Sequence, residues 1–245
     1  MRYGIISDIH GNYEAYKRVL NFFEREKVEK IINCGDIVGY GPLPNECICE
    51  VKNNPKIYSV LGNHDVAVSG IDDISRFNET AVKSINWSQM RIAADNIGYL
   101  KKLKYKRREN NFIFLHGSPR NPLYEYITEE TGAKANFDKL DECICFVGHT
   151  HMPACFRKNP SGRVVSLGLD EEKPIDLISG CRYIINGGSV GQPRDGDSRA
   201  CCLIYDAQKR QVKLHRIKYD IESVQALMRK QKLPGFLSRR LGRGI

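Results

Sequence analysis

Five of the six histidines in this chain lie in short segments where a hydrophobic run ends in a polar, glycine-containing turn, and this pattern constrains the fold most. The segments are residues 4–10, 32–36, 60–65, 114–117 and 146–151. Each carries Asp, Asn or His at its end, and these residues supply the oxygen and nitrogen ligands that divalent metals prefer. Strands that deliver such side chains at one edge of a sheet would build a single site.

Strand and helix patterns alternate through the first two thirds of the chain. Tyr16, Val19, Leu20 and Phe23 recur at helical spacing, which predicts an amphipathic helix over residues 13–27. Further helices are predicted over residues 45–52, 71–103 and 128–139. Short apolar runs predict strands over residues 3–7, 31–32, 57–61, 112–115 and 144–147.

The last third of the chain changes to consecutive strands, predicted over residues 183–185, 200–205 and 212–218, with a hairpin loop at 206–210. Alternating βαβ units followed by consecutive strands predict an α/β fold with two mixed β-sheets packed as a sandwich and helices outside. We expect a single domain over residues 1–245, with residues 66–103 as a helical cap over the site.

Composition excludes two broad classes. No apolar run approaches the ~20 residues of a membrane span, so we expect no membrane segment. The nine cysteines form no C-x-x-C pair and most lie in hydrophobic runs, which favours a reducing cytoplasm over a cysteine zinc site or a disulfide framework.

The net charge of +9 gathers in two segments, residues 101–108 and 229–243. A basic surface attracts polyanions, so the C-terminal segment is a candidate for nucleic-acid binding. The alternative is a solvated face or a charged edge strand, and it is favoured because no aromatic platform interleaves with these charges.

The polar ends of the runs supply enough ligands for two metals. Asp8 and His10 are two residues apart, and in extended backbone such side chains point the same way. His149 and His151 repeat this spacing. The remaining candidates are Asp36, whose carboxylate could bridge two cations, Asn63 and His116. One histidine at a strand end is usually structural, but so many beside Gly, Asp or Asn indicate a metal site.

The order of these motifs resembles that of the calcineurin-like metallophosphoesterases. D-x-H, G-D, G-N-H-D, H and G-H-T-H occur in the family's order and with its approximate spacing. Residues 35–42, 116–120 and 188–197 further resemble the small bacterial and archaeal branch, which includes phosphodiesterases of the YfcE type and relatives described as diadenosine tetraphosphatase-like. The resemblance covers nearly the whole chain and implies the four-layer αββα fold.

The resemblance also implies two divalent metal ions and a role for each residue. Asp8, His10 and His151 would hold the first ion, Asn63, His116 and His149 the second, and Asp36 would bridge them. His64 would stay off the metals and protonate the leaving oxygen, with Asp65 helping to orient it. A metal-bound hydroxide would be the nucleophile. Family metals include manganese, iron, zinc, nickel and cobalt, and this ligand set does not select among them.

The chain departs from the protein-phosphatase members of the family in one motif. Those members carry G-D-x-x-D-R-G, but residues 35–41 here contain neither the second Asp nor the Arg. Arg120 and Arg194, in loops beyond strand ends, are the candidate substrate-binding groups, because an Arg fork suits phosphate oxygens. Alternatively, each arginine only ties loops together by ion pairing.

These features favour a phosphoesterase acting on phosphodiesters or nucleotide-type phosphoanhydrides, with a small-molecule or nucleotide substrate. A phosphomonoesterase or protein phosphatase is the first alternative. A catalytically silent metal-binding scaffold is the second, and it is disfavoured because the chain keeps every ligand and His64. The sequence does not indicate the natural substrate, the metal used in the cell or the oligomeric state.

Overall fold

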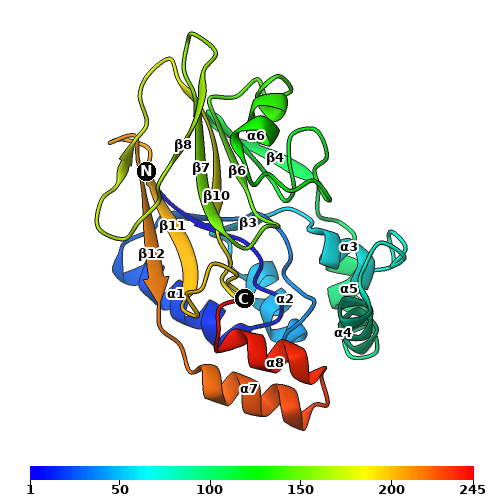
Figure 1. The fold of residues 1–245 in the computed structure, drawn as a ribbon. Helices are drawn as coiled ribbons and strands as arrows, with labels where there is room; N and C mark the ends of the chain where they lie inside the picture. Colours follow the sequence, from blue (N-terminus) through cyan, green and yellow to red (C-terminus); the bar gives the residue numbers. More distant parts are fainter.

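Two mixed six-stranded sheets face each other in the computed structural model, which describes residues 1–245 (Figure 1). The first sheet has the order β3 (Ile57–Ser59), β2 (Lys30–Asn33), β1 (Arg2–Ile6), β11 (Ala200–Asp206), β12 (Gln211–Ile217), β9 (Ile175–Asp176). The second has the order β4 (Lys106–Glu109), β5 (Phe112–Leu115), β6 (Ile144–Val147), β10 (Arg182–Gly187), β7 (Pro153–Lys158), β8 (Val164–Leu167).

Parallel strands form the part of each sheet that positions polar residues. β1, β2 and β3 are mutually parallel in the first sheet, and β5, β6 and β10 are parallel in the second. The remaining pairs are antiparallel. Because the carboxyl ends of parallel strands meet at one edge, the segments that follow these strands are brought together.

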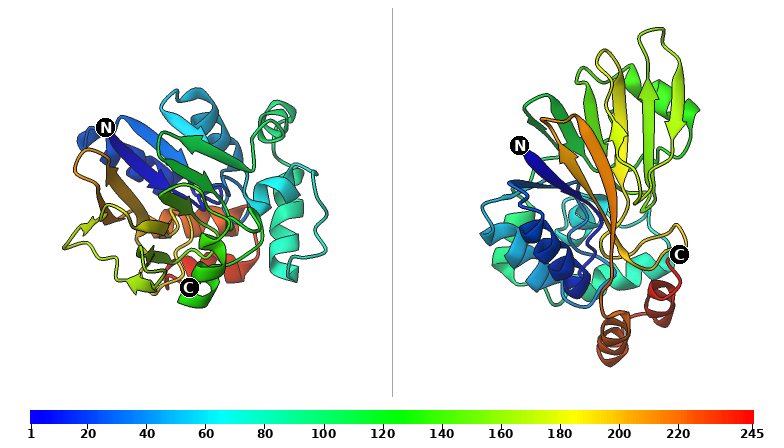
Figure 2. Two further views of the ribbon diagram at one scale, coloured as in Figure 1. Left: turned by 90° about the horizontal axis from the view of Figure 1, so that it is seen from above. Right: turned by 90° about the vertical axis from the view of Figure 1, so that its left-hand side faces the viewer.

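An aromatic core fills the space between the two sheets. Tyr3 and Tyr205 from the first sheet pack against Phe112 and Phe146 from the second, and the Tyr3 and Phe112 rings meet edge to face at 5.1 Å. Burying one such side chain contributes roughly 1.5–3 kcal/mol. This shared core holds the two sheets in the face-to-face packing seen in Figure 2.

Helices cover the outer faces of the sheets. α1 (Tyr13–Arg25) and α2 (Pro44–Asn53) share a core with the first sheet, and α6 (Glu130–Phe137) packs on the second. The Asn12 side chain begins α1 by accepting a hydrogen bond from the Ala15 amide at 3.2 Å. The predicted α/β sandwich with outer helices is therefore confirmed.

The predicted helix over residues 71–103 is wrong over residues 71–78 and is interrupted at residues 90–93. The segment contains α4 (Glu79–Gln89) and α5 (Ala94–Leu100), preceded by α3 (Asn63–Val68), but residues 71–78 form turns and bends. Asp73 Oδ1 accepts a hydrogen bond from the Ser75 amide at 2.7 Å, and Asn78 Oδ1 accepts one from the Ala81 amide at 2.9 Å. Such local side-chain bonds compete with helix formation and place the helix start at Asn78.

The C-terminal basic segment is folded and is not an extended tail. Helices α7 (Ile221–Lys230) and α8 (Gly235–Leu241) pack on each other at one end of the molecule, drawn in orange and red in Figures 1 and 2. Met228, Leu237 and Leu241 are buried in a cluster with Tyr40 and Trp87. The sequence reading missed these two helices and strands β4, β7, β8 and β9.

The other basic segment contains an edge strand. Strand β4 lies at one margin of the second sheet, where Arg108 pairs with Glu142 and Glu109 accepts from Lys30 at 2.6 Å. This arrangement matches the charged-edge alternative. None of the eight helices has both the length and the apolarity needed to traverse a lipid bilayer.

Candidate metal centre

Seven buried polar side chains converge where the parallel strands of both sheets end. Each is at most 7% exposed. Asp8 and His10 follow β1, Asp36 follows β2, Asn63 follows β3, His116 follows β5, and His149 and His151 follow β6. The structure thus brings together all seven residues that the sequence predicts as ligands.

The first set of donor atoms comes from Asp8, His10, His151 and Asp36. Nε2 of His10 lies 3.1 Å from Nε2 of His151, 3.8 Å from Asp8 Oδ1 and 3.5 Å from Asp36 Oδ2. Nε2 of His151 lies 3.3 Å from Asp8 Oδ1. Donors that bind one ion at about 2.0–2.2 Å lie about 3 Å or slightly more from each other, so this set fits a common cation.

The second set comes from His116, Asn63, His149 and again Asp36. Nε2 of His116 lies 2.9 Å from Asn63 Oδ1, 3.1 Å from His149 Nδ1 and 3.4 Å from Asp36 Oδ2. The same Asp36 oxygen therefore belongs to both sets. This geometry is what a bridging carboxylate between two cations requires.

Backbone carbonyls orient three of the histidine rings. Nδ1 of His10 lies 3.0 Å from Val38 O, Nδ1 of His116 lies 2.9 Å from Cys34 O, and Nδ1 of His151 lies 2.7 Å from Gln192 O. Each contact assigns the proton to Nδ1 and leaves a lone pair on Nε2, the pattern that outer hydrogen bonds impose on metal-binding histidines. Oδ1 of Asp8 is buried and accepts no hydrogen bond, so a cation would satisfy it.

The buried carboxylates and imidazoles of this centre shift one another's pKa values. Burial raises the pKa of Asp8 above its usual range. Burial also opposes ionisation of Asp36, but the neighbouring histidines outweigh it and lower the pKa of Asp36. Burial would lower the pKa of His116, yet the Asp36 and Asp8 carboxylates raise it to about 9. Both carboxylates therefore favour positive charge at the position of His116.

Strained backbone presents the ligands. Five of them adopt the left-handed conformation, with φ of 54° at Asp8, 49° at His10, 56° at Asp36, 69° at His149 and 61° at His151. For residues other than glycine this conformation costs roughly 1–2 kcal/mol each. Left-handed backbone in non-glycine residues clusters at functional sites, where surrounding structure enforces it.

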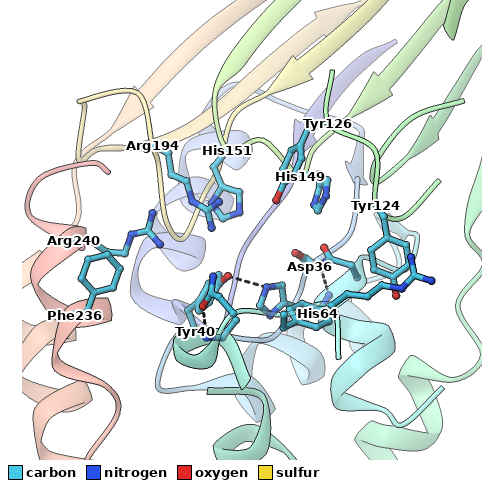
Figure 3. A pocket seen from close by; sticks show the side chains of 15 residues that line it. Asp36, Tyr40, His64, Tyr124, Tyr126, His149, His151, Arg194, Phe236 and Arg240 are labelled. Atoms are coloured by element: carbon cyan, nitrogen blue, oxygen red, sulfur yellow. Dashed lines mark hydrogen bonds between the residues drawn. The ribbon is translucent and has the colours of Figure 1, made fainter. Parts of the chain in front are cut away.

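A cavity of about 640 Å³ opens above the ligands and is lined by fifteen residues (Figure 3). Asp36, Asn63, His149 and His151 form part of its wall. The cavity therefore gives a substrate direct access to both donor sets.

His64 lines the cavity beside the candidate ligands, and one of its ring nitrogens lies within 4.8 Å of the donor atoms of His10 and Asp36. Its Nε2 lies 3.0 Å from the Tyr40 hydroxyl, and its amide donates to Asp36 Oδ1 at 2.8 Å. Burial lowers the pKa of His64 to about 4, although Asp36 acts in the opposite direction. Figure 3 shows the His64 and Tyr40 side chains together in the cavity wall.

Asp65 does not contact the His64 side chain. Its two oxygens accept from the Val38 amide at 3.1 Å and the Gly62 amide at 3.0 Å. It thereby joins the loops after β2 and β3. The hydrogen bond to the His64 ring that its predicted role would suggest is not formed.

The two candidate arginines occupy different surroundings. Arg194 lines the cavity, and its backbone amide donates to the His151 carbonyl at 3.3 Å. Arg120 is about half exposed, pairs with Glu125 at 3.2 Å and does not line the cavity. The structure therefore brings Arg194, but not Arg120, to the candidate site.

Several cavity residues escaped the sequence reading: Arg76, Phe77, Tyr124, Tyr126, Phe236 and Arg240. Tyr126 stacks on His149 with ring centroids 4.0 Å apart, and Arg76 lies over the Tyr124 ring at 5.0 Å. The alternation of Tyr124 and Tyr126 after the H-G-S-P-R motif was a usable signal. In the sequence, Arg240 is distinguished only as part of the basic segment 229–243.

Comparison with known proteins agrees with this geometry. The family model described as calcineurin-like phosphoesterase superfamily domain matches residues 1–210. An uncharacterised protein of Methanocaldococcus jannaschii is 36% identical over 97% of this chain and 96% of its own length. A metallophosphoesterase structure from Sphaerobacter thermophilus is 41% identical with a TM-score of 0.90, covering 100% of this chain and 99% of the other. A hypothetical protein structure from Pyrococcus horikoshii, 19% identical with a TM-score of 0.82 over 100% and 98% of the chains, shares the fold.

Proposed function

This chain belongs to the calcineurin-like phosphoesterase superfamily, and from that premise we propose that it hydrolyses phosphodiester or nucleotide-type phosphoanhydride bonds with two divalent metal ions. The observation that carries the proposal is the position of one atom. Asp36 Oδ2 lies 3.5 Å from Nε2 of His10 and 3.4 Å from Nε2 of His116, so it is shared by two donor sets at the wall of an open cavity.

The residues of the chain divide the chemistry between them. When bound, a pair of divalent ions supplies a nucleophile near neutral pH and neutralises charge on the phosphoryl oxygens. Asp8, His10, His151 and Asp36 would hold one ion, and Asp36, Asn63, His116 and His149 the other. Manganese, iron, zinc, nickel and cobalt all accept this mixture of nitrogen and oxygen donors.

His64 is the proposed proton donor to the leaving oxygen. Its Nδ1 is enclosed without a partner, whereas Nε2 meets the Tyr40 hydroxyl inside the cavity wall. The proton would therefore leave from Nε2. The bound anionic phosphoester would stabilise the protonated ring, which burial alone disfavours.

The cavity favours a diester or anhydride over a phosphoprotein. The loop after Asp36 lacks the arginine that phosphoprotein phosphatases place there, so Arg194 is the proposed phosphate-binding group. Residues 76–78 and Ala81 also line the cavity. This contribution supports residues 66–103 as a cap over the site within one domain.

The nine free cysteines support a reducing cytoplasm as the location of the protein.

The test is hydrolysis of bis-p-nitrophenyl phosphate with added manganese or nickel. We expect activity in the wild type and in His215→Gln, which alters the one histidine outside the site. Activity should be lost in Asp36→Asn. Full activity in Asp36→Asn would contradict the proposed metal centre, and a higher rate on p-nitrophenyl phosphate would instead favour a phosphomonoesterase.

A second comparison isolates His64. Proton donation typically contributes about 10²–10⁴-fold to the rate, and it matters most for poor leaving groups. His64→Ala should therefore retain its metals and lose far more activity on a diester whose leaving group is an alkoxide, such as a thymidine dinucleotide, than on the p-nitrophenolate bond of bis-p-nitrophenyl phosphate. Equal losses for both bonds would rule out a proton donor at this position.

A further inference from the structure

Helix α8 carries two side chains into the cavity from a part of the chain that the family model does not cover. The match ends at residue 210, whereas Phe236 and Arg240 belong to α8 (Gly235–Leu241). Both line the cavity at the metal centre. Both also line a neighbouring hollow of about 310 Å³, together with Tyr40 and Asn78. The C-terminal helices thus extend the cavity away from the metal ligands.

Arg240 and Arg194 are two cations that share one side of this cavity (Figure 3). Burial lowers the pKa of Arg240 to about 10, and the positive charge of Arg194 acts in the same direction. Phe236 supports the Arg240 guanidinium, whose centre lies 5.4 Å from the ring centroid. Two like charges held in a partly buried wall are unfavourable unless an anion lies between or beside them.

Neither arginine pairs with an Asp or Glu side chain. Arg194 donates from Nη2 to Gln192 Oε1 at 3.1 Å, and its buried Nε has no partner. Arg240 donates from Nε to the backbone oxygen of Ile245. The nearby Arg199 and Arg216, by contrast, are paired with carboxylates. Acidic side chains therefore neutralise Arg199 and Arg216, whereas the cavity-lining Arg194 and Arg240 have no Asp or Glu partner.

We propose that Arg240, beside the phosphate-binding Arg194, binds a second phosphate of the substrate, one that is not at the metals. This inference rests on the proposed function and names its substrate class: a nucleotide-type phosphoester with at least two phosphate groups. Arg forks bind phosphate oxygens with strong, charge-assisted hydrogen bonds. The backbone amide of Arg194 donates to the His151 carbonyl, so Arg194 lies beside the candidate metal ligands. Arg240 lines the neighbouring hollow together with Phe236, farther from those ligands.

The experiment compares two probes that differ by one phosphate: the p-nitrophenyl ester of thymidine 5′-phosphate, with and without a phosphate on the 3′ oxygen. The wild type should show a KM at least about tenfold lower for the phosphorylated probe, the effect of one or two charge-assisted hydrogen bonds. Arg240→Gln should abolish this preference by raising only that KM, with kcat unchanged. Gln is as good a helix former as Arg, so α8 should be retained.

Two matched variants control the result. Arg239→Gln changes the preceding residue of α8, which is exposed and outside the cavity, and should keep the preference. Arg240→Lys retains charge without the fork and should restore part of it. Equal KM values in the wild type, or an equal loss on both probes in Arg240→Gln, would overturn the inference. If bis-p-nitrophenyl phosphate is still hydrolysed, the proposed function survives that outcome; if no diester is hydrolysed, the proposed function itself fails.

Discussion

Nε2 of His10 lies 3.1 Å from Nε2 of His151, although 141 residues separate the two histidines in the chain. Carbonyls of Val38 and Gln192 hold the Nδ1 atom of each ring, so two Nε2 lone pairs face each other. Burial lowers the pKa of both rings well below the usual 6.5, so protonation does not relieve the contact. A shared metal cation would relieve it.

Metal removal should therefore destabilise the protein. A ligand at about 100 times its Kd stabilises the folded state by about 2.7 kcal/mol, which for a domain of this size shifts Tm by roughly 5–10 °C. We expect chelation to lower Tm by about this amount and manganese to restore it. Thermal unfolding monitored by circular dichroism measures the shift, with His215→Gln as the control that keeps it. An unchanged Tm would count against resident metals.

The bridging position of Asp36 predicts different metal contents for two variants. Asp36→Asn weakens both donor sets, whereas Asn63→Ala removes one neutral oxygen from the second set only. Replacing a residue that only hydrogen-bonds to a metal ligand typically lowers metal affinity about 10–100-fold. Losing a direct ligand should lower it at least as much. After gel filtration, elemental analysis should find close to one ion per chain in Asn63→Ala and less in Asp36→Asn. Equal contents in the two variants would argue against a bridge.

The sequence could predict that these seven polar side chains converge because the pattern that places them is local. A buried run followed by Asp, Asn or His fixes a strand end, and parallel pairing then brings those ends together. The prediction that these residues share a site because their backbone is extended was partly wrong. Asp8 and His10 do meet one donor set, but both adopt left-handed backbone and not the extended form that the i, i+2 argument assumed. His149 and His151, with the same spacing, reach different donor sets.

The rest of the cavity depends on long-range packing that periodicity does not encode. Arg240 reads as one of many basic residues near the C-terminus, and its position follows only from Leu237 and Leu241 burying against Tyr40 and Trp87. Arg120 and Arg194 look alike in sequence, since both follow strand ends. In the structure Arg120 pairs with Glu125 outside the cavity, whereas Arg194 lines it.

Close backbone packing behind the metal centre predicts that Gly191→Ala will be damaging. A Cβ atom at this glycine would lie 1.8 Å from the carbonyl oxygen of Ile9, and the Gly191 amide donates to the Asp8 carbonyl at 2.9 Å. The loop after β10 would have to move away from the loop that carries Asp8. Overpacking typically costs about 1–3 kcal/mol, so we expect a lower Tm and weaker metal binding.

Gly98→Ala is the matched control for that substitution. Gly98 lies in helix α5, where nothing approaches an added Cβ within 4 Å. Alanine in a helix interior is more stable than glycine by about 0.5–1 kcal/mol, so this variant should have an equal or higher Tm. A Gly191→Ala protein as stable as Gly98→Ala would show that the loop yields more easily than its contacts indicate.

His215 should make stability depend on pH independently of the metal centre. It lies in β12 with its ring 4.8 Å from that of Phe22. Burial, followed by the charge of Lys213, lowers its pKa below 6.5; Arg2 acts in the same direction, and Glu26 and Glu171 oppose it. The unfolded chain therefore binds the proton more readily than the folded one. The neutral His215 ring therefore contributes stability above the unfolded pKa of about 6.5. This contribution is lost as the pH falls below that value, and the loss stops once the pH is below the folded pKa.

The measurement is urea unfolding of the wild type and His215→Gln across about pH 5 to 8. Wild-type stability should fall relative to the variant as the pH is lowered, because glutamine takes up no proton. The ligand histidines titrate in both proteins, so their contribution cancels in the difference. Parallel curves for the two proteins would mean that the environment of His215 does not disfavour its charged form.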